Sequence, residues 1–413
     1  MVRIRHILIS LVLGYLAACS SPQESQKENP TFSTDQAREA LRFAAEQYHR
    51  MIPTVPDSVL PKSIKEDSSL RITGIKDWVS GFYPGTLWYL FEYTGDSLFL
   101  AEARQRTELL EPLRHFREHH DLGFMVYCSF GNGWRITGDS AYRAVMQDAA
   151  HSLASRFMPT AGVIKSWDWT RNGSWRYPVI IDNMMNLELL TWAAKSAKKD
   201  HLLKIAISHA DTTLKHHYRP DLSTWHVVDY DSLRGGTLNK LTHQGYSDSS
   251  AWARGQAWSL YGYAMMYRET QKPEYLQRAQ QVAHFILTHP RLPEDKVPYW
   301  DFDAPNIPDA PRDASSAALM ASALLELQSF ASTDSLRQTY LGTAEHMLAS
   351  LSSPAYRAQP GANGNFILMH SVGHLPGNSE VDVPLTYADY YYVEALLRYL
   401  AVKGEFQFKP VIY

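Results

Sequence analysis

Cysteine is almost absent from this chain, whose 413 residues include only Cys19 and Cys128. A disulfide-stapled scaffold is therefore excluded, because small secreted domains of that kind depend on several cross-links. If Cys19 is consumed by a modification, Cys128 is the only thiol left and no intramolecular disulfide can form. We expect Cys128 to be a small buried residue and not a nucleophile.

An excess of basic charge is also lacking. Lys and Arg number 40 against 43 Asp and Glu, for a net charge of −3. A nucleic-acid partner is not expected, since such proteins carry a basic surface. Aromatic residues, in contrast, are abundant, at 12% of the chain with 11 Trp and 24 Tyr. Aromatic rings offer flat apolar faces on which sugar rings can stack, so the composition favours a carbohydrate partner.

No long apolar run is present at the N-terminus, where the apolar residues 7–16 are too few to cross a membrane. Positive residues precede this run and small residues follow it, so residues 1–18 are predicted to be a signal peptide. The sequence Leu-Ala-Ala-Cys ending at Cys19 resembles the lipobox of bacterial lipoproteins, which predicts lipidation of Cys19. An ordinary signal peptide is the alternative. Residues 19–32, rich in Ser, Gln, Glu and Pro, are predicted to be a flexible tether.

A weak repeat begins at residue 33. Thr-Gly-Asp-Ser occurs at residues 94–97 and again at 137–140, and looser copies follow. Each copy places a turn or N-capping residue before a charged, amphipathic helix. Between these helices lie six segments that are poor in charge and rich in Gly, Ala and aromatic residues, namely residues 81–93, 125–136, 183–197, 251–267, 314–330 and 385–400.

A helix that is apolar nearly all round is buried. Six buried helices that alternate with six amphipathic ones predict an all-α fold, an (α/α)6 barrel that occupies residues 33–413 as one catalytic domain. An open solenoid is the structural alternative, but no polar capping repeat is evident at either end. Residues 220–239 and 290–313, which carry Pro, Gly and Asp, are predicted to be loops at one rim of the barrel.

Asp182 lies in an apolar setting at the start of the third buried helix, after Val179, Ile180 and Ile181. Burial disfavours a charged carboxylate and raises its pKa, which suits a proton donor. The simpler interpretation is that Asp182 caps the helix that follows. Asp121 also stands at the entrance of a buried helix, so the two acids together could supply the pair of carboxyl groups that a glycosidase needs.

Other polar residues gather at the same predicted rim. His120, His226 and His243 could bind a metal, but the spacing of known metal motifs is missing, and we expect neither a metal nor another cofactor. Arg254 would be costly to bury without an anionic partner. A substrate carboxylate and a structural acid such as Asp248 remain equal candidates for that partner.

Five motifs together resemble the unsaturated glucuronyl hydrolases, glycoside hydrolase family 88. They are Asp-Trp-Val-Ser-Gly-Phe at 77–82, His-Asp-Leu-Gly-Phe at 120–124, Ile-Asp-Asn-Met-Met-Asn at 181–186, Ser-Ala-Trp-Ala-Arg-Gly-Gln-Ala-Trp at 250–258 and Tyr-Ala-Asp-Tyr-Tyr at 387–391. The resemblance extends over about residues 33–405, nearly the whole chain after the tether.

The resemblance implies an (α/α)6 barrel that removes a Δ4,5-unsaturated uronic acid from the non-reducing end of oligosaccharides made by polysaccharide lyases. In such an enzyme an acid protonates C4, water adds at C5, and the hemiketal that results opens and releases the neighbouring sugar. By the same resemblance Asp182 is the general acid and base. Asp121 is the second essential carboxylate, with His120 alongside.

The resemblance also implies a set of substrate-binding residues. His226, Gln244 and Arg254 match residues that contact the acid group and hydroxyls of the uronate, and Trp78, Trp167, Trp252 and Trp258 match its aromatic walls. The loop at residues 369–380 offers Ser371 as a further contact but contains no Lys or Arg. The sequence therefore gives no place for a sulfate group, and the choice among glycosaminoglycan substrates stays open.

Two alternatives remain. A related unsaturated rhamnogalacturonyl hydrolase would perform the same chemistry on pectin fragments, and a non-catalytic glycan-binding lipoprotein would bind sugar without consuming it. In each case the expected partners are an unsaturated uronate-containing saccharide and a membrane reached through the lipid anchor, with no nucleic acid. Substrates of disaccharide size favour the periplasmic side.

Overall fold

The computed structural model describes residues 32–169 and 175–413. The predicted signal peptide at residues 1–18, the lipidation site Cys19 and the tether up to residue 31 lie outside the described residues. Among the helices described, none has the length and apolar character needed to span a membrane.

The outer layer of the fold consists of helices that pack one face against the rest of the protein. Apolar positions at helical spacing give each of them one buried side. These helices are α1 (Thr34–Met51), α3 (Ser97–Glu108), α5 (Ser140–Ala154), α7 (Asp200–His216), α9 (Pro273–Thr288) and α11 (Asp334–Leu351).

Several outer helices begin where the repeat predicts. The side chain of Ser33 accepts a hydrogen bond from the backbone of Gln36 and the Gln36 side chain accepts one in return, which is a capping box. Asp96 and Asp139, in the two Thr-Gly-Asp-Ser copies, each accept a hydrogen bond from the backbone of their own helix. The turn chemistry of the repeat therefore sets these helix starts locally.

The inner layer consists of helices that are buried nearly all round, as the sequence predicts. The second of them differs in detail, because residues 123–131 form a π-helical run that continues directly as a short α-helix. The inner elements are α2 (Phe82–Thr94), η3 (Gly123–Gly131) with α4 (Asn132–Thr137), α6 (Asn183–Ala197), α8 (Ala253–Thr270), α10 (Ala314–Leu327) and α12 (Thr386–Val402).

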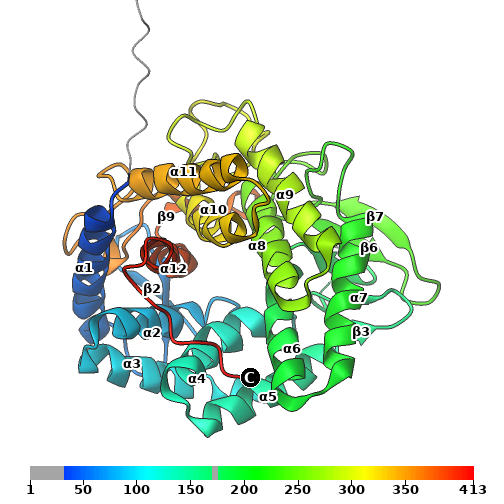
Figure 1. Ribbon diagram of the computed structural model, residues 1–413, viewed down its shortest axis with the longest axis horizontal. Helices are drawn as coiled ribbons and strands as arrows, with labels where there is room; N and C mark the ends of the chain where they lie inside the picture. The colour runs from blue at the N-terminus through cyan, green and yellow to red at the C-terminus, as the bar shows by residue number, and fades with distance from the viewer. Residues whose placement is uncertain (1–31, 170–174) are drawn as a thin grey trace, which may run out of the picture.

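The ring of inner helices is closed. Each inner helix packs against the next, and α12 returns to pack against α2, while α1 covers α12 (Figure 1). The all-α (α/α)6 barrel is thus confirmed, and the open solenoid is wrong, because a solenoid would leave its first and last repeats apart. Figure 1 also shows the C-terminal segment crossing one opening of the ring, where Ile412 accepts hydrogen bonds from the indoles of Trp134 and Trp192.

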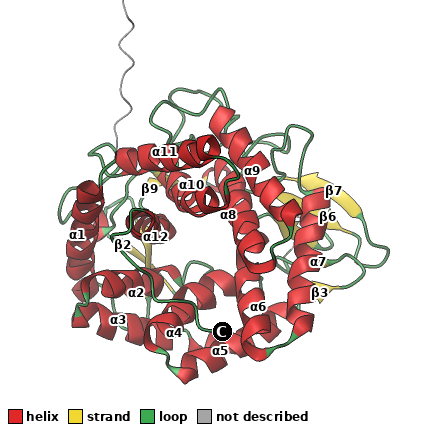
Figure 2. Cartoon of the chain, viewed as in Figure 1, coloured by secondary structure: helices red, strands yellow, loops and turns green. Residues whose placement is uncertain are grey.

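The connecting loops contain strands that the sequence analysis did not predict, including two in and beside the predicted loop at 220–239 (Figure 2). They form four small antiparallel sheets. These strands are β1 (Leu60–Ile64) with β2 (Leu70–Thr73), β3 (Phe157–Met158) with β4 (Val163–Ile164), β5 (Pro178–Ile180) with β6 (Val227–Tyr230) and β7 (Thr237–Leu241), and β8 (Ser371–His374) with β9 (Ser379–Val383). Short 3-10 turns occur at η1 (Ile52–Thr54), η2 (Glu111–His115), η4 (Gln328–Phe330), η5 (Asn363–Asn365) and η6 (Leu375–Gly377).

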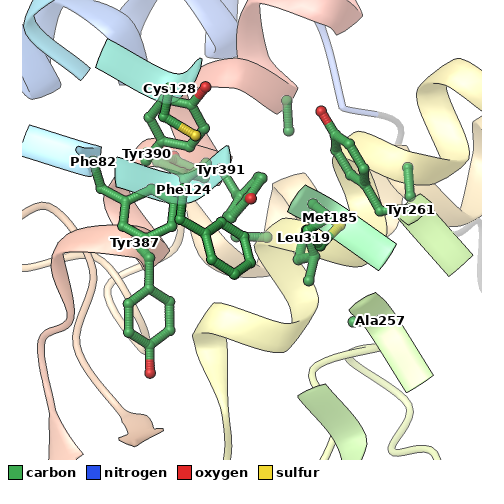
Figure 3. Close-up of a cluster of buried hydrophobic side chains, with 14 of the residues drawn as sticks. Phe82, Phe124, Cys128, Met185, Ala257, Tyr261, Leu319, Tyr387, Tyr390 and Tyr391 are labelled. Atoms are coloured by element: carbon green, nitrogen blue, oxygen red, sulfur yellow. The ribbon is translucent and has the colours of Figure 1, made fainter. Parts of the chain in front are cut away.

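The centre of the barrel is filled by aromatic side chains from the inner helices (Figure 3). Phe82, Phe124 and Tyr391 pack together there, and Cys128 is buried among them as expected. In Figure 3 the ring of Tyr387 lies at the edge of this cluster and its hydroxyl points away from it. The middle of the barrel is therefore closely packed.

Candidate active site

A cavity of about 740 Å³ lies at the end of the barrel where the inner helices begin. Its volume is suited to a small-molecule ligand, since such pockets span roughly 300–1,000 Å³. It brings together six of the residues predicted from the sequence, which come from separate helix entrances and loops. The six are Trp78, Asp121, Trp167, Asp182, Gln244 and Arg254.

Asp182 stands between strand β5 and helix α6, in the N-cap position of the helix. Its side chain makes no capping hydrogen bond to the described backbone, and only 7% of the residue is exposed. The simpler interpretation of Asp182 as a side-chain helix cap is therefore wrong. The carboxyl group points into the cavity instead, and no described atom forms a hydrogen bond with its Oδ2.

Burial raises the pKa of Asp182 from 3.8 to about 7. The guanidinium of Arg254 acts in the opposite direction, and the negative charge of Asp121 adds to the increase. Asp182 therefore holds a proton up to neutral pH, at a position where it can pass that proton to a bound ligand.

Asp121 has the opposite character although it lines the same cavity. Burial alone would raise its pKa, but the neighbouring His120 and His119 lower it below its usual value. The Nδ1 atom of His119 lies 3.0 Å from Oδ2 of Asp121, and Nε2 of His120 lies 3.3 Å from Oδ1. The site thus pairs one protonated and one charged carboxyl group.

Close packing of two helices keeps the carboxyl groups together. A Cβ atom added at Gly123, in η3, would lie 2.5 Å from the Cα atom of Asn186 in α6. The Oδ1 atom of Asn186 also accepts a hydrogen bond from the backbone of Phe124. Glycine is therefore required at position 123, because a larger residue would push apart the helix entrances that carry Asp121 and Asp182.

His226 faces Asp182 as a neutral ring in a fixed orientation. Its Nδ1 accepts hydrogen bonds from the backbone N–H groups of His243, at 3.1 Å, and Gln244, at 3.0 Å. The proton of the ring must therefore be on Nε2, which lies 3.7 Å from Oδ2 of Asp182. Burial also lowers the pKa of His226 well below its usual value, so the ring does not add a positive charge beside Asp182.

Arg254 is compensated by a structural acid, but not by the one suggested from the sequence. Its Nη1 lies 3.2 Å from Oδ2 of Asp313, and its Nη2 donates a 2.5 Å hydrogen bond to the carbonyl oxygen of Gly373. Asp248, the acid considered in the sequence analysis, accepts instead from the backbone of Thr242. Both Arg254 and Asp313 are almost fully buried, and Arg254 still reaches the cavity surface.

Five predicted site residues lie behind the cavity surface. They are buried with at most 3% exposure, and they support the residues that line the cavity. Trp252, for example, packs its ring over the guanidinium of Arg254 at 4.6 Å. The five are His120, His226, Trp252, Trp258 and Ser371.

The aromatic walls come from two predicted residues and two others. The rings of Trp78 and Tyr387 lie 4.9 Å apart on one side of the cavity. Trp167, which also lines the cavity, stacks on Trp169 with ring centroids 4.8 Å apart, and 47% of Trp169 is exposed. Aromatic surface thus extends from the interior of the cavity to its mouth.

Sequence reasoning missed the contribution of the β1–β2 hairpin. Lys62, on β1, lines the cavity and lies 2.8 Å from Asp77 and 3.4 Å from Glu380. No signal in the sequence around Lys62 pointed to this location. Because two carboxylates already pair with it, Lys62 does not by itself make a sulfate site.

A second cavity, of about 310 Å³, lies at the opposite end of the barrel beneath the C-terminal segment. None of the predicted site residues lines it. Within residues 32–169 and 175–413, no group of three or more His, Cys, Asp and Glu side chains is arranged to hold a metal ion.

Several known proteins are similar to this chain in both sequence and fold. No family model matches the sequence. An unsaturated glucuronyl hydrolase of Formosa agariphila is 48% identical over 324 residues, which cover 78% of this chain and 80% of that protein. The crystal structure of an unsaturated glucuronyl hydrolase specific for heparin has a TM-score of 0.88 and 46% identity, and covers 91% of this chain and 100% of its own.

A third relative was solved with a saccharide bound. An Asp-to-Asn variant of the unsaturated glucuronyl hydrolase of Streptococcus agalactiae, complexed with dGlcA-GalNAc6S, has a TM-score of 0.78 and 28% identity, and covers 90% of this chain and 93% of its own. The resemblance drawn from the five motifs is confirmed by these likenesses. With a barrel and a two-carboxylate cavity of this kind, the chain belongs to the unsaturated glucuronyl hydrolases, the glycosidases of family 88.

Proposed function

We propose that this enzyme removes a Δ4,5-unsaturated uronic acid from the non-reducing end of glycosaminoglycan oligosaccharides. The uncapped, buried carboxyl group of Asp182, which faces the cavity in protonated form, carries this proposal. Relatives whose names specify heparin, or whose complexes contain an N-acetylgalactosamine sulfate, favour a glycosaminoglycan over a pectin fragment.

The proposed reaction is a hydration of the vinyl ether. Asp182 gives its proton to C4, so that positive charge develops at C5 and on the ring oxygen. Water then adds to C5, and the proton that it loses returns to the Asp182 carboxylate. The hemiketal opens, the anomeric carbon becomes a hemiacetal, and the neighbouring sugar leaves with its own oxygen. Asp121 stays charged and stabilises the cationic transition state.

The arrangement around Asp182 supports this chemistry. Carbon is a poor base, so its protonation requires an acid that is not weakened by solvent. Asp182 is 7% exposed, and His226 presents only a neutral N–H toward it. Arg254 favours the charged form of Asp182, which the acid must reach after it has given up its proton.

The experiment follows the ultraviolet absorbance of the conjugated double bond with four disaccharides. We expect the absorbance to disappear with an oxygen-linked unsaturated glycosaminoglycan disaccharide and also with its sulfur-linked analogue. Sulfur is protonated too weakly to leave by direct acid-catalysed cleavage, but hydration at C4 and C5 does not require that step. A saturated disaccharide does not have this absorbance, and chromatography should show that it releases no monosaccharide. A pectin-derived unsaturated disaccharide should react much more slowly.

Each of the contrary outcomes identifies a different alternative. Resistance of the sulfur-linked analogue alone would show direct displacement at the anomeric carbon. Preference for the pectin fragment would favour the rhamnogalacturonyl hydrolase. Binding of all the unsaturated sugars without any loss of absorbance would show a glycan-binding protein.

We also propose that lipidation of Cys19 anchors the enzyme to a membrane, on its periplasmic side. The Leu-Ala-Ala-Cys sequence supports this proposal. In a bacterial host, the unaltered chain should incorporate labelled fatty acid and sediment with membranes, whereas Cys19→Ala should do neither. A Cys128→Ala variant is the matched control and should behave as the unaltered chain does. Equal membrane association of both variants would exclude the anchor.

A further inference from the structure

We propose that His119 is a positioning residue that holds Asp121 in place as an anion beside Asp182. The inference rests on the proposed function, because it concerns the charge that Asp121 supplies in that reaction. His119 comes directly before the His-Asp-Leu-Gly-Phe motif and is not part of it. It lines the cavity, and its backbone forms an isolated antiparallel β-bridge with Trp167.

Both ring nitrogens of His119 face oxygen atoms that can only accept hydrogen bonds. Nδ1 lies 3.0 Å from Oδ2 of Asp121, and Nε2 lies 3.1 Å from the carbonyl oxygen of Lys76. A neutral imidazole carries one proton and would leave one of these contacts between two lone pairs. The geometry therefore points to an imidazolium that donates to both oxygens, and such charge-assisted hydrogen bonds are the stronger kind.

The neutral form of His119 has a different partner available. The backbone N–H of Asp121 lies 3.3 Å from the same Nδ1 and can donate to it only when that nitrogen carries no proton. Loss of the proton would thus exchange a contact with the Asp121 carboxylate for one with the Asp121 backbone. Burial acts to lower the pKa of His119, but its hydrogen bond to the Asp121 carboxylate and the charge of that group raise it overall.

Among the described residues, two other basic side chains, those of His120 and Arg156, do not supply a positive charge to Asp121 through a hydrogen bond. Burial lowers the pKa of His120 to about 4, so this ring is neutral at neutral pH. Arg156 is directed elsewhere, since it donates to Asp168 and to the carbonyl oxygen of Lys165. His120 and the side chain of Asn186 also lower the pKa of Asp121, and His119 adds to them a hydrogen bond that its positive charge strengthens.

Charged groups that approach His119 from the neighbouring segments are few. Asp121 and His120 lie on its own segment, and Arg156 acts on it from the end of α5. Lys76 and Glu118 pair with each other at 2.5 Å, and the ammonium group of Lys76 lies over the ring of Phe116, which also packs against His119. The Asp121 carboxylate is thus the one negative charge in direct contact with the ring among the residues described.

The charge of His119 affects which of the two acids in the cavity, Asp121 or Asp182, carries a proton. When Asp121 is held as an anion, its charge raises the pKa of Asp182 and keeps the proton there. When His119 is lost, the pKa of Asp121 should rise toward that of Asp182, and the two acids then compete for protons. The enzyme would lose its charged carboxylate at a higher pH than before.

The test is the pH profile of His119→Gln, which removes the charge but keeps a side chain that can form hydrogen bonds. We expect the acid limb of kcat to move up by about one pH unit, because a cation in contact with an Asp lowers its pKa by 1–3 units. KM should change much less than kcat. His119→Lys retains a positive charge, so its acid limb should lie close to that of the unaltered enzyme.

His49→Gln is the matched control, because His49 forms a His–Asp pair of the same kind, 2.9 Å from Asp96, on the exposed outer surface. Its profile should coincide with that of the unaltered enzyme. A coincident profile for His119→Gln would overturn the proposal, as would an equal loss of kcat at every pH.

A second measurement needs no variant of His119. In the unaltered enzyme, ¹⁵N spectra of labelled histidine should show both ring nitrogens of His119 protonated at about pH 6, and Asp121→Asn should remove this state. A neutral His119 at that pH would contradict the inference even if activity assays were normal. Retained activity in Asp182→Asn would instead contradict the proposed function and leave the protonation state of His119 to be judged by its own spectrum.

Discussion

Asp182→Asn should lose at least about a thousandfold in kcat toward unsaturated disaccharides while the barrel stays folded. The amide is almost the same size as the acid but has no acidic proton to give to C4. It also cannot take up the proton that water loses when it adds to C5. The measurement is the rate of absorbance loss, with the far-ultraviolet circular dichroism of the variant as a check of folding.

Asp334→Asn is the control, because Asp334 has a side chain that is 88% exposed, pairs with Arg337 at 3.1 Å on the outer helix α11 and does not line the cavity. An exposed ion pair of this kind contributes little, so activity should remain within about threefold of the unaltered enzyme. Near-normal turnover by Asp182→Asn would show that the mechanism proposed for this site is wrong.

Asp182→Asn should lower kcat but raise the stability of the folded protein at neutral and higher pH. Because the Asp182 pKa is raised from 3.8 to about 7, the folded state holds a proton that the unfolded chain has already lost between these two values. Stability of the unaltered enzyme therefore falls as pH rises from about 4 to about 7. Asp182→Asn has no carboxyl group to bind this proton, so its stability does not fall in this way. Above pH 7 it should be more stable than the unaltered enzyme, by at most about 4 kcal/mol. Thermal unfolding of both proteins at two pH values measures the difference.

Asp313→Asn is expected to lower the free energy of unfolding by about 3–5 kcal/mol, the range found when one partner of a buried ion pair is removed. The amide leaves the guanidinium of Arg254 buried without a compensating charge. Asp313 also caps helix α10, where it accepts hydrogen bonds from the backbone and hydroxyl of Ser315. Urea denaturation should show a lower midpoint with an unchanged slope.

A double-mutant cycle separates the two roles of Asp313. Arg254→Met combined with Asp313→Asn removes both charges, so the double variant should be more stable than Asp313→Asn alone. If Asp313→Asn lowers the free energy of unfolding by less than about 1 kcal/mol, the carbonyl oxygens of Val372 and Gly373 are sufficient to stabilise Arg254 without its ion pair. Activity should fall together with stability, since Arg254 also lines the cavity.

Local patterns in the sequence were sufficient for the helices. The capping residues Ser33, Asp96 and Asp139 mark helix starts because each acts on backbone groups only two or three residues away. The contrast between amphipathic and fully apolar segments distinguished outer from inner helices for the same reason, since burial of a helix is recorded along its own length. The strands were missed, because pairs as short as β3 and β4 leave no period to detect.

The site was only partly predictable. Asp121 and Asp182 could be found because each charged group interrupts an apolar stretch at a helix entrance, and the motifs around them carry the family resemblance. Their different charge states could not be read in this way. The acid of Asp182 remains protonated because the fold buries it, while Asp121 remains charged because the side chains of His120 and His119 turn toward its carboxylate.

By itself the sequence determined a closed set of helical hairpins, the two carboxyl groups and the family to which they belong. Only the tertiary structure decided which partners these groups have. Arg254 finds its counter-charge in Asp313, 59 residues further along the chain, and not in the nearby Asp248. Helix periodicity and capping act within a few residues, whereas burial and ion pairing depend on which helix entrances meet when the ring closes.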